Sequence, residues 1–296
     1  MATAGNNFES RQKVLGYPVD VVNESEALSM IEKSWDLSRT MHVVTINAEM
    51  VIQAQKDNRL DRIIRHAHLI VPDGAGAVFA LRLDGHDSVR VPGIELAEKA
   101  LSSAAGKGIP VALLGSKAEI IEKLRKDLPK IHPGLNICAS HDGYISEAEE
   151  EAVVREIAGS KPGLLLVAMG VPRQEYFIDK WISLFPGTVI IGVGGSFDVF
   201  AGAVKRAPVL FQKLHLEWFY RLMKEPWRFN RMASTLPNFA FQVLFNHFFN
   251  SSPRAISASD PHPSAGRRSH TPKKRRARDP QDRSKKSTES KESTDL

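Results

Sequence analysis

Short apolar runs alternate with segments of helical periodicity between residues 11 and 208, and residues 48–64 form the clearest helical segment. The apolar runs predict strands at 42–46, 68–71, 111–115, 135–140, 164–168 and 188–193. Strands separated by helices at this spacing are typical of a parallel α/β sheet. The last two runs lack polar alternation, which predicts that both faces of the sheet are buried. We therefore predict an α/β fold with a Rossmann-like, mostly parallel sheet flanked by helices.

Helix starts are marked by proline and by capping residues. Pro92 suits the first turn of a helix that runs to about residue 105. Ser116 with Glu119, and Ser146 with Glu149, have the spacing of a capping box, in which two side chains satisfy the first N–H groups of a helix. The sequence therefore predicts helices that open at these three places.

After residue 208 the pattern changes to closely spaced aromatic and basic residues. Arg221, Lys224, Arg228 and Arg231 are three or four positions apart, so on a continuous helix they share one cationic face. Such a face either rests on anionic lipid, with aromatic side chains at the interface, or is a solvated face over a packed helix. Pro226 interrupts the helix, but the aromatics beside the cations favour a helical, membrane-associating appendage over 209–250.

The net charge of +6 comes entirely from residues 251–296, which hold 12 Lys and Arg against 6 Asp and Glu. This segment nearly lacks aliphatic side chains, which predicts a disordered basic tail, and residues 1–10 are predicted to be a flexible N-terminus. The remainder is neutral, so nucleic-acid binding is not favoured outside the tail. A single cysteine, Cys138, excludes an intramolecular disulfide. We expect neither a signal peptide nor a membrane-spanning segment of about 18–20 apolar residues.

In a parallel sheet, ligands bind beyond the carboxyl ends of the strands, which makes the residues after each predicted strand candidates for a site. These candidates are Thr45, Asn47, Asp73, Gly115, Ser116, residues 169–174 and residues 194–198.

Asp73 follows a strand end through Pro72, and a carboxylate there suits a general base, although the residues alone favour a helix cap or an Asx-turn. Thr45 and Asn47 lie two apart, so their side chains project to the same side and suit hydrogen bonding to a sugar or base. Asn47 also suits the cap of the following helix, and the two roles are compatible. The residues alone leave these alternatives open.

A glycine cluster at 192–195 contains Gly194 and Gly195, which let a backbone approach a phosphate. The dinucleotide-binding fingerprint requires a third glycine where Phe197 stands, and there is no Walker motif. The histidines and Cys138 show no metal-ligand spacing, and no Asp-x-Asp pair is present. We therefore predict no metal site and no cofactor.

Taken together, the motifs of the chain resemble the WecG/TagA/CpsF glycosyltransferase family, glycosyltransferase family 26, from about residue 14 to residue 231. The matching segments, in order, are Thr45–Glu49, Pro72–Gly74, Arg90–Gly93, Gly170–Glu175, Gly192–Asp198, Lys205–Pro208, and Glu217–Trp218 through Arg221 to Pro226. Each motif is weak alone, whereas all seven in this order are specific.

The resemblance implies transfer of a hexose or N-acetylhexosamine, with inversion, from a UDP-sugar to a polyprenyl-diphosphate-linked sugar in cell-surface polysaccharide synthesis. It implies no metal cofactor and a cytoplasmic enzyme, peripheral on the inner face of the bacterial membrane. By motif, Asp73 is similar to the catalytic base, and Thr45 and Asn47 to sugar or nucleotide contacts. Arg90 and Gln174 are similar to pocket residues.

Asp198 is similar, by the same resemblance, to a uridine contact. Arg221, Arg228 and Arg231 are similar to cations of an appendage that closes the site at the membrane. The alternatives are a Rossmann-type oxidoreductase and nucleic-acid binding through the tail. Donor sugar, acceptor and oligomeric state, including a homo-oligomer, stay open.

Overall fold

The computed structural model describes residues 11–205, 207–208, 211, 220 and 229–250. The predictions of a flexible N-terminus at 1–10 and of a disordered tail at 251–296 concern residues outside this described part, as does most of 209–228.

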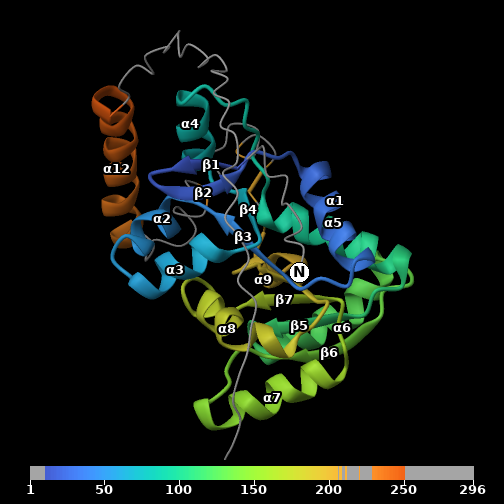
Figure 1. Cartoon of the computed structure of the whole chain (residues 1–296). Coiled ribbons are helices and arrows are strands. Elements are labelled where there is room, and N and C mark those ends of the chain that lie inside the picture. The colour runs from blue at the N-terminus through green and yellow to red at the C-terminus, as the bar shows by residue number, and fades with distance from the viewer. Residues whose placement is uncertain (1–10, 206, 209–210, 212–219, 221–228, 251–296) are drawn as a thin grey trace, which may run out of the picture. The chain divides into compact units, whose positions relative to one another are not determined.

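The centre of the fold is a six-stranded sheet in the order β4-β3-β8-β7-β5-β6 (Figure 1). The strands are β3 (Met41–Ile46), β4 (Leu69–Pro72), β5 (Val111–Gly115), β6 (Ile137–His141), β7 (Leu164–Ala168) and β8 (Val189–Gly192). Every neighbouring pair in this sheet is parallel. The predicted α/β class and parallel sheet are therefore confirmed, and the predicted strands agree to within about two residues at each end.

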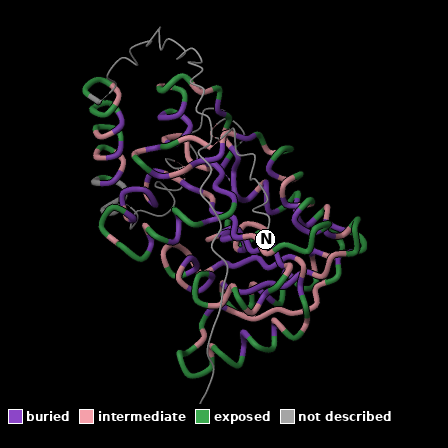
Figure 2. The backbone as a smooth tube through the Cα atoms, viewed as in Figure 1, coloured by how far each residue is buried: buried purple, intermediate pink, exposed green. Residues whose placement is uncertain are grey.

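Both faces of the sheet are buried, as the continuous apolar strands predict (Figure 2). On one face Val43, Leu113 and Ile191 pack with α1 (Glu24–Asp36), α5 (Gly93–Lys107), α6 (Ala118–Ile131) and the short α9 (Ser196–Phe200). On the other face Val44 and Ile70 pack with α2 (Ala48–Ala54), α3 (Asn58–His66) and α4 (Ala75–Leu83). Farther along that second face lie α7 (Glu147–Gly159), α8 (Arg173–Trp181) and the 3-10 helix η1 (Ile182–Leu184).

Two local predictions were wrong. Residues 48–64 form two helices, because the Asp57 carboxylate accepts from the N–H groups of Arg59 and Leu60 and so starts α3 anew. The second capping box is confirmed, with Ser146 and Glu149 at the start of α7. At the first one, however, Lys117 is the residue before α6, and no side chain caps that helix.

An antiparallel hairpin precedes the sheet and was not predicted from the sequence. It comprises β1 (Arg11–Val14) and β2 (Tyr17–Asp20), joined by a two-residue turn at Leu15 and Gly16, both with positive φ. Buried Asp20 pairs with Arg11 at 2.7 Å, and Asp20 Oδ2 accepts from the N–H of Ile70 at 2.8 Å. The hairpin is thereby tied to the edge strand β4.

The described end of the predicted appendage is helical, with α12 (Phe229–Phe245) followed by a π-helical turn, η3 (Asn246–Asn250). Phe239 and Val243 of α12 are buried in the same cluster as α2. A side chain at Gly76 would reach within 3.1 Å of the Phe239 ring, so this glycine lets α12 approach the first turn of α4. Among the described residues, no helix has the length and apolar character needed to cross a bilayer.

Candidate functional site

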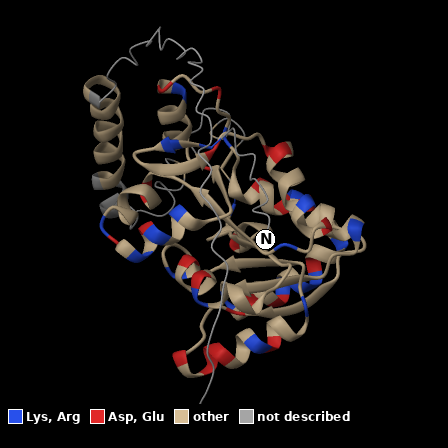
Figure 3. Cartoon of the chain, in the orientation of Figure 1, with Lys and Arg blue, Asp and Glu red and all other residues tan. Residues whose placement is uncertain are grey.

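The loops after the parallel strands meet at one edge of the sheet, and the charged side chains at that edge come from these loops and from the helices that follow them. None of the six strands contains Lys, Arg, Asp or Glu, and charged side chains lie mainly on the surrounding helices and loops (Figure 3). The predicted positions after the strands all lie at this edge, since every strand runs in the same direction. They form two groups, one on β3 and β4 and one on β5, β7 and β8.

The first group, which we call the β3–β4 cluster, comprises Thr45, Asn47, Asp73 and Arg90. The loop after β4 folds onto β3, since the N–H groups of Asp73 and Gly74 both donate to the carbonyl of Ile46, at 3.0 and 3.3 Å. A Cβ at Gly74 would lie 2.8 Å from the Asn47 Cβ, so only glycine permits this approach. The sequence-predicted residues of the two strands are thus brought together.

Arg90 fixes the Asp73 loop from the other side. Its Nε donates to the Asp73 carbonyl at 2.5 Å, and its Nη2 lies 3.5 Å from Asp73 Oδ1. The neighbouring Val91 N–H donates to the Pro72 carbonyl at 2.9 Å. The Asp73 side chain remains 29% exposed and that of Arg90 16% exposed, so the pair is accessible from the edge of the sheet.

Thr45 and Asn47 are held differently. A Cβ at Gly93, the first residue of α5, would lie 2.8 Å from Thr45 Cγ2, so the start of α5 rests directly on the threonine. Asn47 caps α2, and its Oδ1 accepts from the Met50 N–H at 3.0 Å. The capping role considered for Asn47 is therefore present, and its amide nitrogen is left to face other partners. Both side chains are half-buried.

Gln174 lies beneath the second group of loops. Its side chain is 2% exposed, and its Oε1 accepts from the N–H groups of Gly170 at 3.1 Å and Gly194 at 3.0 Å. Its Nε2 donates to Glu175 Oε1 at 2.9 Å. One amide therefore joins the loop after β7 to the loop after β8, which places Gln174 under the pocket loops and not on their surface.

Glu175 is buried behind Gln174, with 1% of its surface exposed. Burial raises the pKa of its carboxyl group from the ordinary 4.5 to about 7, because the anion loses its hydration, and the hydrogen bond from Gln174 lowers the pKa in part. Within the described part of the chain, Glu175 Oε2 is buried without a hydrogen-bond partner. Gln174 and Glu175 both belong to the Gly170–Glu175 motif noted in the sequence, but no sequence pattern signals the burial of Glu175.

The second group also contains Ser116 and Asp198. Ser116 Oγ donates to Asp198 Oδ1 at 3.4 Å, and the Ser116 N–H donates to the Ala168 carbonyl at 2.9 Å. Ser116 adopts a φ of 56°, a conformation that costs a non-glycine residue about 1–2 kcal/mol. This conformation explains why it does not cap α6. Asp198, predicted on its own, is therefore contacted by a residue of the loop after β5.

The remaining predicted residues are placed as follows. Gly194, with a φ of 52°, and exposed Gly195 form the turn between β8 and α9. Arg221 and Arg228 lie outside the described residues, and Arg231 lies in the first turns of α12, where only the backbone is described. In the described ranges, no group of three or more His, Cys, Asp or Glu side chains is arranged to hold a metal ion.

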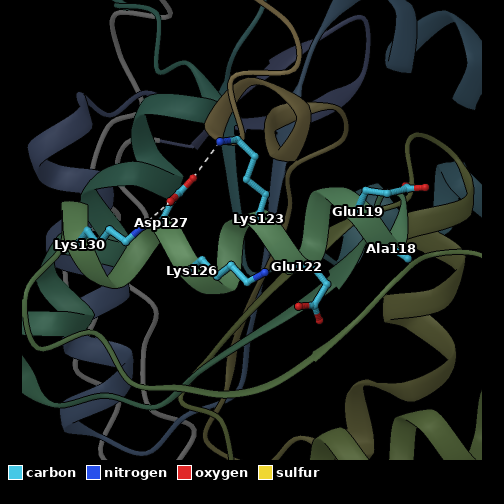
Figure 4. Close-up of a pocket in the computed structure, with 7 residues that line it drawn as sticks. All are labelled: Ala118, Glu119, Glu122, Lys123, Lys126, Asp127 and Lys130. Carbon is cyan, nitrogen blue, oxygen red and sulfur yellow. Dashed lines mark hydrogen bonds and ion pairs between the residues drawn. The ribbon is translucent and has the colours of Figure 1, made fainter.

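A shallow hollow of about 630 Å³ follows the outer side of α6 (Figure 4). Its lining residues are Ala118, Glu119, Glu122, Lys123, Lys126, Asp127 and Lys130. Lys123 and Lys130 both pair with Asp127 at 2.9 Å, so its cations and carboxylates neutralise one another. The hollow contains none of the residues of the two groups, and we assign it no part in the site.

Comparison with known proteins identifies a family and several relatives. Residues 12–253 match the family described as "Glycosyl transferase WecG/TagA/CpsF family". Similar curated proteins are named N-acetylglucosaminyldiphosphoundecaprenol N-acetyl-beta-D-mannosaminyltransferase. The one from Bacillus spizizenii is 39% identical over 71% of this chain and 80% of its own length. Those from Bacillus subtilis and Staphylococcus aureus are 38% and 39% identical, over 68% and 70% of this chain and 78% and 80% of their own lengths.

Proposed function

The chain belongs to the WecG/TagA/CpsF family of glycosyltransferases, and from this membership we propose that it transfers N-acetylmannosamine, or a related hexose, from a UDP-sugar to a polyprenyl-diphosphate-linked sugar. The names of the relatives favour N-acetylglucosaminyl-diphosphoundecaprenol as the acceptor. The matched family gives no support to the oxidoreductase alternative or to nucleic-acid binding through the tail.

One observation carries the proposal: Asp73 and Arg90 form an accessible pair beside Thr45 and Asn47 at the carboxyl ends of two parallel strands. In the proposed reaction, an acceptor hydroxyl oxygen attacks the anomeric carbon while its proton passes to the Asp73 carboxylate. The bond from that carbon to the diphosphate oxygen breaks, and its electron pair leaves with UDP. Because attack and departure are on opposite faces of the sugar, the configuration inverts.

The surrounding residues would serve this step by position. Arg90 holds the Asp73 loop through its contact with the loop carbonyl, and Thr45 and Asn47 offer hydroxyl and amide groups to the sugar. On the donor side, Asp198 would accept from uridine hydroxyl or imide groups. Preorganised hydrogen-bonding groups of this kind act without reorganisation at the moment of reaction.

The diphosphate would lie by the Gly194–Gly195 turn, where the absence of side chains lets the backbone approach. We propose that Arg221, Arg228 and Arg231 neutralise the departing diphosphate or the anionic lipid surface, and that no metal ion is needed. Unchanged turnover in a chelator such as EDTA is the expected result, and turnover that is lost and restored by Mg²⁺ or Mn²⁺ would contradict this part.

We also propose that the enzyme works as a peripheral protein on the cytoplasmic face of the membrane. Phe241, Phe245, Phe248 and Phe249 of α12 and η3 are exposed, the last two by 70% and 73%. The rings of Phe241, Phe245 and Phe249 stack at centroid distances of 5.9 and 4.8 Å, which forms a continuous aromatic strip. Aromatic side chains at the surface of an amphipathic helix suit the lipid interface.

The decisive experiment combines a donor screen with one substitution. UDP-sugars are offered with a short polyprenyl-diphosphate-N-acetylglucosamine, and the product linkage is read by NMR. Asp73→Asn should lower kcat by about 10²–10⁴-fold, the usual contribution of a general base, and leave UDP binding intact. Asp36→Asn, an exposed substitution at the end of α1, is the matched control and should retain full activity. Near-normal turnover by Asp73→Asn would remove Asp73 from this role.

A further inference from the structure

Two buried side chains in succession, Gln174 and Glu175, form a unit that the proposed reaction does not use directly. A side-chain amide has an accepting oxygen and a donating nitrogen of nearly equal size, so its orientation depends on its partners. Both loop N–H groups, of Gly170 and Gly194, point at the oxygen of Gln174. If the amide were reversed, its nitrogen would face two donors, and both loops would lose their anchor.

Glu175 is the group that fixes this orientation. Its Oε1 accepts from Gln174 Nε2 at 2.9 Å, which places the nitrogen of the amide away from the loops and the oxygen towards them. The fold makes room for the pair at the end of β8. A Cβ at Gly192 would lie 2.5 Å from Gln174 Nε2 and 3.2 Å from Glu175 Oε1.

Burying a carboxyl group is costly, and a stabilised core would more simply place an apolar side chain there. Glu175 nevertheless has one oxygen on Gln174 and the other, Oε2, buried without a partner within the described ranges. Among the described residues, the cost is therefore not offset by a salt bridge at Glu175, and the side-chain partner of its carboxyl group is the amide of Gln174. This arrangement is explained by the position that it gives to the amide and not by a gain in stability.

We propose that Glu175 is a positioning residue, which orients the Gln174 amide and through it holds the Gly194–Gly195 turn in the conformation that receives the donor diphosphate. The first half of the proposal concerns the protein alone. The second half rests on the proposed UDP-sugar donor. The two halves need separate measurements.

The first measurement is amide hydrogen exchange of Gly170 and Gly194, followed by NMR on the full-length protein. In the wild type both N–H groups are protected by Gln174 Oε1. Glu175→Met removes the acceptor with little change in volume and should raise both exchange rates by about tenfold or more, as expected for the loss of one hydrogen bond. Glu175→Gln keeps an accepting oxygen and should restore protection to near the wild-type level.

The second measurement is the Kd for UDP by calorimetry. Glu175→Met should weaken UDP binding by about tenfold, and Glu175→Gln by less than about threefold. The double variant Gln174→Glu with Glu175→Gln exchanges the two groups, so that a carboxylate accepts from both loops and an amide donates to it. It should bind UDP more tightly than Gln174→Glu alone, which places two carboxyl groups in contact.

Tyr176→Phe is the matched control, since Tyr176 follows Glu175 and its hydroxyl donates to Asp57, the residue that caps α3, away from the amide. It should leave both exchange rates and the Kd unchanged, whatever its effect on Tm. Unchanged exchange at Gly170 and Gly194 in Glu175→Met would overturn the proposal. Faster exchange with unchanged UDP affinity would overturn its second half. A wild-type protein that binds no UDP would instead contradict the proposed donor, while the exchange data would still decide the orientation of the amide.

Discussion

Replacing Glu175 by glutamine removes a carboxyl group that the fold buries almost completely, and the effect on stability should depend on pH. Burial raises the pKa of this group from 4.5 to about 7 in the folded protein. In the unfolded chain the group is hydrated and ionises near its ordinary value. The folded state therefore holds its proton over a pH range in which the unfolded state has released it.

The direction and size of the effect follow from proton linkage. Below about pH 4.5 the group is protonated in both states, and its contribution is constant. As the pH rises towards 7, deprotonation favours the unfolded state, and the wild type loses about 1.4 kcal/mol of unfolding free energy for each pH unit. The interval from 4.5 to about 7 corresponds to about 3 kcal/mol, which is lost once the pH has passed the folded pKa.

Glu175→Gln has no proton to release, so its stability relative to the wild type should increase by about 2–3 kcal/mol between pH 5 and pH 8. A constant offset is also expected, because the glutamine NH₂ would occupy the place of Oε2, which has no hydrogen-bond partner among the described residues. The test therefore depends on how the difference in unfolding free energy between the two proteins changes with pH. The assay is urea unfolding of both proteins at four pH values, with Glu156→Gln on the exposed side of α7 as a surface control. A difference that stays constant from pH 5 to pH 8 would refute the reasoning.

Two further predictions concern the outer parts of the site. Ser116→Gly relieves the positive φ of 56°, so it should leave the free energy of unfolding unchanged or raise it by about 1 kcal/mol. Loss of the hydroxyl contact to Asp198 should raise the KM for the donor several-fold. A donor KM equal to that of the wild type would show that Ser116 does not position Asp198. Replacing Phe245 and Phe249 together by serine should reduce co-sedimentation with anionic vesicles by about tenfold and leave UDP binding intact. Val89→Ser, at an exposed position beside Arg90 in the segment between α4 and α5, provides the apolar control. Equal vesicle binding by the wild type and both variants would remove the aromatic strip from membrane association.

The sheet could be predicted from the sequence because burial on both faces leaves a direct mark on composition. Strands such as 164–168 consist only of apolar residues, and their spacing by helices permits few topologies. The strand ends then gave Thr45, Asn47 and Asp73, which the structure brings together through Gly74 and Gly93. Polar residues placed just after apolar runs are a local signal, and one edge of a parallel sheet collects them.

Other features depend on contacts between residues far apart in the chain and left no local mark. The contact of Ser116 with Asp198 joins residues 82 positions apart. The spacing of Ser116 and Glu119 suggested a capping box, but no side chain caps α6. The hairpin escaped prediction because its turn has leucine, and not asparagine or glycine, at the first left-handed position, Leu15. In the sequence, Asp57 is one of several polar residues in the helical segment 48–64 and does not stand out, although its carboxylate starts a second helix there.

The six uncharged strands have a consequence for how the enzyme can change. Packing and register depend on apolar side chains, whereas every Lys, Arg, Asp and Glu at the carboxyl edge of the sheet lies in a loop or helix that connects the strands. A substitution in one of these segments alters recognition without requiring the interior to be repacked. Related enzymes can therefore acquire new sugar preferences on an unaltered scaffold, and transplanting single connections between relatives is a practical route to redesigned polymers.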